Sequence, residues 1–61
     1  MVKHLSTEEL AERLGVPAET VRYWRATGGG PAYMRTGKYV RYREVDVTAW
    51  EKSRIVTSRA S

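Results

Sequence analysis

The sequence predicts a small α+β domain that is mainly helical, and three observations support this class. Two early segments, 7–14 and 17–26, carry apolar residues at helical spacing. Segment 32–43 instead alternates around a Thr-Gly pair, as a β-hairpin does, and a third helical pattern begins near residue 44. A chain of 61 residues has room for one such domain.

The first helix is predicted to span Thr7 to Leu14. Ser6 suits the N-cap position, and Glu9 follows three residues later, which is the spacing of a capping box. Leu10 then begins the apolar stripe that would face the core. Gly15 supplies the positive φ at which helices commonly end.

The second helix is predicted to span Pro17 to Ala26, because proline is favoured at a helix entry and three glycines follow at 28–30. The glycines are interpreted as a flexible loop and not as a phosphate cradle, since no helix start follows them. The two helices are joined through Gly15 and Val16, which is typical of a helix-turn-helix.

Two faces of the second helix differ in chemistry. Val21 and Trp24 lie three residues apart on one face, so we expect them to pack with Pro17 against the first helix. The opposite face is expected to carry Glu19, Arg22, Tyr23 and Ala26, with Thr20 and Arg25 on the flanks.

Segment 32–43 is predicted to be a β-hairpin that turns at Thr36-Gly37. Alternation places Val40 and Tyr42 on the inner face, and Met34 is expected to join them. The hairpin tip and outer face would then carry Arg35, Lys38, Tyr39 and Arg41.

The last helix is predicted to begin near Glu44, since acidic residues favour the positive end of a helix. Val47 and Trp50 form its apolar stripe, and the pattern fades after Lys52. We therefore expect one domain over residues 1–53 and a short flexible tail over 54–61.

The charge of the chain is unevenly distributed. Its net charge is +4, yet residues 20–43 contain six basic residues and no acidic one, which leaves five basic and seven acidic residues elsewhere. A basic block between mildly acidic ends favours a polyanionic partner, with nucleic acid first. The plain alternative is a solvated basic surface.

The composition also excludes several functions. The chain has no cysteine and one histidine, and it carries none of the familiar nucleophile motifs, so we expect neither an enzyme nor a bound metal or cofactor. The sequence shows no long apolar run or signal-peptide pattern. It therefore predicts a soluble cytoplasmic protein with no membrane partner.

Three motifs resemble a known family when they are taken in order. "LSTEELAERLGV", "ETVRYW" and "GKYVRYREVDVTAW" are similar to the small winged helix-turn-helix proteins of the excisionase and MerR-like group, from about Leu5 to Trp50. Long MerR-type activators continue into a coiled coil and an effector domain, whereas this sequence stops soon after the third helix. The excisionase-like branch is therefore the expected one.

The resemblance implies double-stranded DNA as the partner, with the second helix in the major groove and the wing on the minor groove or backbone. By matching position, Arg22 and Tyr23 are second-helix contacts, and Lys38 and Arg41 are wing contacts. Arg22 can pair with guanine, although a phosphate contact is equally open, and Glu19 can accept from cytosine. The predicted DNA-contacting residues are Ala18, Glu19, Thr20, Arg22, Tyr23, Arg25, Arg35, Lys38, Tyr39 and Arg41.

Three functions remain open at this point. In the first, excisionase-like copies bind adjacent sites head to tail, bend the DNA and help an integrase to reverse its reaction. The second is a small MerR-like transcription regulator with the same DNA surface. The third is a protein-interaction module, such as an antitoxin, whose basic face meets an acidic protein.

Overall fold

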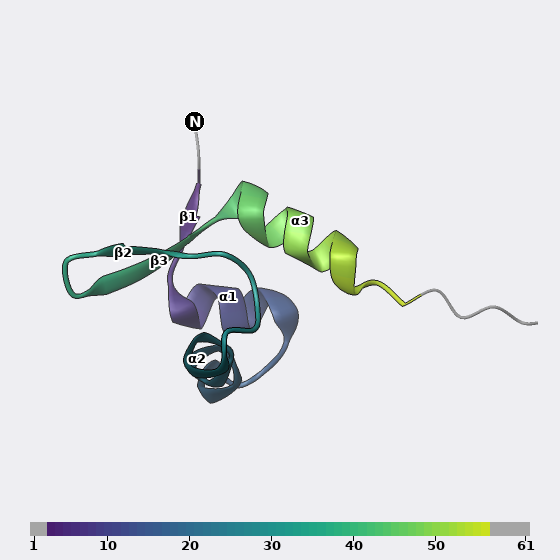
Figure 1. Cartoon of the computed structure of the whole chain (residues 1–61), viewed down its shortest axis with the longest axis horizontal. Coiled ribbons are helices and arrows are strands. Elements are labelled where there is room, and N and C mark those ends of the chain that lie inside the picture. The colour runs from purple at the N-terminus through teal and green to yellow at the C-terminus, as the bar shows by residue number, and fades with distance from the viewer. Residues whose placement is uncertain (1–2, 57–61) are drawn as a thin grey trace, which may run out of the picture.

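The computed structural model describes residues 3–56 and confirms the predicted α+β class. Figure 1 shows α1 and α2 packed together, with the hairpin and α3 leaving this pair in opposite directions. The fold is that of a winged helix-turn-helix domain. The elements in chain order are β1 (His4–Leu5), α1 (Thr7–Leu14), α2 (Ala18–Thr27), β2 (Met34–Thr36), β3 (Tyr39–Arg43) and α3 (Glu44–Arg54).

Helix α1 has the predicted bounds because both of its ends are capped. The Ser6 hydroxyl accepts from the Glu9 backbone N–H at 3.1 Å, and the Glu9 carboxylate accepts from the Ser6 N–H at 2.8 Å. Gly15 has a φ of 71°, and its N–H donates to the last carbonyls of the helix. The predicted capping box and glycine stop are confirmed.

Helix α2 begins and ends one residue later than predicted. Pro17 is its N-cap, with an extended backbone, and its carbonyl accepts from the Thr20 N–H at 2.9 Å. At the other end Thr27 stays helical, and Gly28 closes the helix with a φ of 83°. Pro17 was predicted to pack against the first helix, and this prediction was wrong. The residue is exposed, because the N-cap position lies beyond the packed face of the helix.

The sheet has one strand more than predicted. Its order is β1-β3-β2, and β1 pairs antiparallel with β3 so that Leu5 lies opposite Tyr42. A strand of two residues is too short to show the alternation that signals a strand. Strand β1 nevertheless gives β3 a second hydrogen-bonded neighbour, besides β2, at the base of the hairpin.

The hairpin turn lies one residue later than predicted, at 37–38, with Thr36 opposite Tyr39. Gly37 has a φ of 62°, as the first central residue of a type II′ turn requires. This shift reverses the faces of β2, because adjacent residues of a strand point to opposite sides. Met34 lies opposite Arg41 on the outer face and Arg35 lies opposite Val40, so the inner-face prediction for Met34 was wrong.

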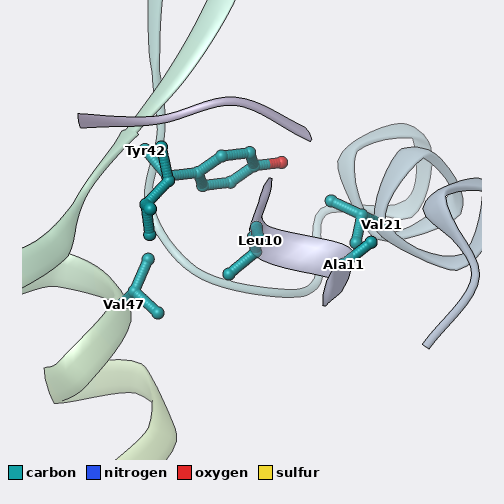
Figure 2. Packing of buried hydrophobic residues seen from close by; sticks show 6 residues of the cluster. Leu10, Ala11, Val21, Tyr42 and Val47 are labelled. Carbon is teal, nitrogen blue, oxygen red and sulfur yellow. The ribbon is translucent and has the colours of Figure 1, made fainter. Parts of the chain in front are cut away.

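The core is shared by every element except β2. Figure 2 shows Tyr42 of β3 reaching toward Leu10 of α1, with Val21 of α2 and Val47 of α3 on either side. Trp24 is half-buried, and its ring centroid lies 5.2 Å from that of Trp50. The buried hydrophobic residues are Leu5, Leu10, Ala11, Val21, Tyr42 and Val47.

Helix α3 begins at Glu44 as predicted, directly after β3, and continues to Arg54, the first residue assigned to the tail. The Glu44 N–H donates to the Lys3 carbonyl at 2.8 Å, which ties the helix start to the chain just before β1. Residues 57–61 of the predicted tail lie outside the described residues.

Arg13 of α1 adds a polar attachment of α3 to the contacts of Val47 and Trp50. Arg13 donates two hydrogen bonds to the Glu51 carboxylate, at 2.9 and 3.0 Å, and further bonds to Glu44 and Thr48 at 3.3 Å. The hydrogen bond from Arg13 lowers the pKa of Glu51 below its ordinary value. A bidentate arginine–carboxylate pair of this kind fixes orientation as well as distance.

Candidate nucleic-acid interface

Helix α2 presents one polar, exposed face to solvent. Val21 is fully buried against α1, and helical geometry therefore turns Arg22 and Tyr23 outward. Tyr23 is 65% exposed, although an aromatic ring of this size is usually covered. Glu19 and Ala26 are also exposed, as predicted for this face, whereas Ala18 and Thr20 are half-buried.

Arg22 is held in place by a carboxylate of the neighbouring helix. Its Nη2 donates to Glu8 Oε2 at 2.8 Å, and the two side chains are 51% and 68% exposed. An ion pair this exposed contributes little free energy, so a DNA phosphate or base could replace Glu8 at small cost. The pair orients the guanidinium across the α1–α2 junction.

Arg25 points inward from the flank of α2. Its Nη1 donates to Thr7 Oγ1 at 2.9 Å and to the Tyr42 hydroxyl at 3.1 Å. The guanidinium also lies over the ring of Tyr33, 6.0 Å from its centroid. Arg25 therefore stands apart from the exposed α2 residues with which it was predicted to contact DNA.

The wing carries a cluster of cations around one exposed aromatic ring. Tyr39 is 54% exposed, and the charged groups of Lys38 and Arg41 lie 5.7 and 5.2 Å from its ring centroid. Cations over a ring face are favourably placed. An open groove of about 360 Å³ crosses this outer face, and it is lined by His4, Met34, Thr36, Tyr39 and Arg41.

Ion pairs in the described residues hold three arginines, one of them at the base of the wing, and leave the cations nearer the wing tip unpaired. Arg13, Arg22 and Arg43 each bind a carboxylate, and the Arg43–Asp46 hydrogen bond lowers the pKa of Asp46. Within residues 3–56, by contrast, no carboxylate pairs with Arg35, Lys38 or Arg41. The positive charge of these three residues is therefore not neutralised by the described part of the protein.

The predicted contact residues form two groups in the structure, and most of them are exposed, although Ala18, Thr20, Arg25 and Arg41 are half-buried. One lies on α2, and the other lies on the wing, where Arg35 occupies the opposite sheet face from Tyr39 and Arg41. The partners Thr7, Glu8 and Tyr33 were not predicted from the sequence. These pairs join residues 8 to 18 positions apart, and no local pattern signals them.

The described residues can also be compared with the requirements of a metal site and of a membrane span. Residues 3–56 contain no group of three or more His, Cys, Asp or Glu side chains that could hold a metal ion. None of the helices described is long and apolar enough to cross a membrane.

Comparison with known families agrees with this geometry. A family model described as a helix-turn-helix domain matches residues 5–54, which is most of the chain. The chain therefore belongs to the helix-turn-helix domain family, which includes excisionase-like DNA-binding proteins. Family membership indicates DNA binding, and such domains are not typically enzymes. No curated protein matches the chain.

Proposed function

We propose that this protein binds double-stranded DNA in a sequence-specific manner, with α2 in the major groove and the wing on the adjacent minor groove or backbone. The observation that carries the proposal is the outward face of α2, where Arg22 and Tyr23 are exposed while Val21 anchors the helix. An α-helix fits the major groove of B-DNA and can present such side chains to base edges.

The exposed residues have different roles in this proposal. Arg22 leaves Glu8 and pairs with a guanine or a phosphate, and Glu19 accepts from a cytosine amino group. Tyr23 donates its hydroxyl to a phosphate. On the wing, the cations that lack a carboxylate partner neutralise phosphates and release counterions, and this group comprises Arg35, Lys38 and Arg41, next to Tyr39.

Within this function we favour an excisionase-like architectural factor. In this role several copies bind adjacent sites head to tail, bend the DNA and direct integrase-mediated excision. The support is the family, which includes excisionase-like proteins, together with a wing whose cations are available to deform and hold the backbone. A small transcription regulator is the second candidate, since the same surface would serve at a promoter.

A footprint distinguishes these roles. Genomic fragments that the protein retains at physiological salt are selected first, and the protected bases on each fragment are then mapped. Several closely spaced protected repeats beside a recombination site support the excisionase-like role, whereas one short footprint over a promoter supports the regulator. No retained fragment would contradict DNA binding and would favour a protein-interaction module.

A further inference from the structure

We propose that Arg25 is a positioning residue, which sets the orientation of the wing relative to α2 and does not itself bind phosphate. The inference rests on the proposed function, because the property that it controls is simultaneous contact of α2 and the wing with one duplex. It assigns to Arg25 a different role from that of the exposed Arg22 one turn earlier on the same helix.

The hydrogen-bond partners of Arg25 are buried groups of two other elements. Thr7, in the first turn of α1, is 8% exposed, and Tyr42, near the C-terminal end of β3, is 1% exposed. Both accept from the same Nη1 atom, at 2.9 and 3.1 Å. One guanidinium nitrogen therefore joins the last turn of α2 to α1 and to the wing strand.

The aromatic contacts extend this link to the start of the wing. Tyr33 directly precedes β2, and its ring receives the Arg25 guanidinium on one face. The rings of Tyr33 and Tyr42 lie 5.8 Å apart with an angle of 53° between their planes. Arg25 therefore contacts the base of both wing strands.

The architecture gives this link a specific importance. Helix α2 packs on α1, whereas the sheet packs on α1 and α3. Among residues 3–56, the bond from Arg25 to Tyr42 is the one hydrogen bond between α2 and the sheet. The orientation of the wing relative to α2 therefore depends on this side chain and on the shared apolar core.

The chemistry of the contacts also favours positioning over charge neutralisation. Both acceptors are neutral hydroxyls, and no carboxylate in the described range pairs with Arg25. The planar guanidinium can donate to both acceptors while it stacks on a ring, which a lysine ammonium cannot reproduce. Lys38 lies four residues from Tyr42, or roughly 13 Å at about 3.3 Å per residue, so a rotation of about 10° at the base displaces the tip by about 2 Å.

The test uses the salt dependence of binding to a duplex chosen by footprinting. Tyr42→Phe removes one acceptor without any change of charge, and Arg25→Lys keeps the charge but not the planar geometry. We expect both variants to bind severalfold more weakly and to reduce the slope of log affinity against log salt by about one unit, because wing phosphate contacts are lost. Lys38→Ala should then have less effect in the Tyr42→Phe background than in the wild-type protein.

Both variants keep the positive charge at position 25, which is all that a direct phosphate contact needs. A wild-type slope and affinity in both variants would therefore overturn the inference. Melting curves identify any variant that fails to fold, and Thr7→Val, which removes the other acceptor, then replaces Tyr42→Phe. If the wild-type protein binds no duplex, the proposed function fails. If it binds and Lys38→Ala alone lowers the slope, only the inference about Arg25 fails.

Discussion

At the scale of single residues, the proposed DNA contact requires Arg22 to leave its carboxylate partner. In the free protein its guanidinium binds Glu8 at 2.8 Å on an exposed surface. A DNA phosphate or guanine offers comparable hydrogen bonds together with the release of counterions. Glu8 orients Arg22 in the free protein, and in the proposed complex it would compete with DNA for this side chain.

Substitutions on the two sides of this ion pair should act in opposite directions. Arg22→Ala should weaken specific binding by roughly 1–3 kcal/mol if the side chain pairs with a base. Glu8→Gln should strengthen binding by up to about 1 kcal/mol, because no exposed ion pair has to break. Fluorescence anisotropy titrations with one selected duplex measure both. Unchanged affinity in a folded Arg22→Ala variant would remove Arg22 from the interface.

The residue scale also shows why some predictions succeeded and others did not. The start of α1 was predictable because Ser6 and Glu9 bond to each other within three residues. The face of Met34 was not, since it depends on whether the turn lies at 36–37 or 37–38, and Gly37 fits either choice. The inward direction of Arg25 depends on partners 17 and 18 residues away.

At the scale of elements, the loop from α2 to β2 was predicted only as a flexible glycine run, but its glycines have distinct conformations and surroundings. Gly28 and Gly30 have φ values of 83° and 81°, which L side chains rarely adopt. A Cβ atom on Gly30 would lie 3.0 Å from the Cβ of Trp24, whereas one on Gly29 would meet its neighbours at 3.9 Å or more. Gly29 therefore has room for a side chain, whereas Gly30 does not.

Alanine substitutions at these two glycines form a matched pair. Gly30→Ala should lower the free energy of unfolding by about 1–3 kcal/mol through backbone strain and crowding of Trp24. Gly29→Ala should change it by less than about 1 kcal/mol, because its backbone and surroundings admit a methyl group. Urea unfolding monitored by tryptophan fluorescence measures both. Equal effects in the two variants would contradict this structure of the loop.

The attachment of α3 should depend on pH. Arg13 lowers the pKa of Glu51 in the folded state, so the pair stabilises the protein above the ordinary glutamate value of 4.5. This stability is lost as the pH falls through the lower pKa of the folded state. Glu51→Gln should therefore lower the melting temperature at pH 7, by an amount equivalent to at most about 1 kcal/mol, and should flatten its decline below pH 4.5.

Thermal melts between pH 7 and pH 3 test this expectation. Glu12→Gln is the matched control, since Glu12 is an exposed carboxylate of α1 that forms no ion pair within residues 3–56. The same melting temperature and pH profile for Glu51→Gln and the control would show that the Arg13 network does not hold α3.

At the scale of the whole molecule, two projecting parts share one small core. The hairpin and α3 leave the α1–α2 pair in opposite directions (Figure 1), and Tyr42 and Val47 anchor them beside Leu10 and Val21 (Figure 2). The fold class, the order of the three helices and the hairpin, and the buried face of α2 were predictable, because each follows from local periodicity. The third strand and the ion pairs were not, since they arise only when distant segments meet.

The paired and unpaired cations also lie in different parts of the molecule. Carboxylates of α1 and α3 neutralise Arg13, Arg22 and Arg43, whereas Arg35, Lys38 and Arg41 of the wing have no such partner among the described residues. Salt-dependent DNA affinity should therefore arise mainly from the wing, and specificity should arise mainly from α2.

The most direct test of DNA binding through α2 and the wing is the affinity of a selected duplex measured across salt concentrations. The wild-type protein, Lys38→Ala at the wing tip and Lys52→Ala on α3 would be compared. We predict strong salt dependence for the wild-type protein, a slope lower by about one unit for Lys38→Ala, and an unchanged slope for Lys52→Ala. No duplex binding at physiological salt, or equal slopes for the two lysine variants, would contradict it.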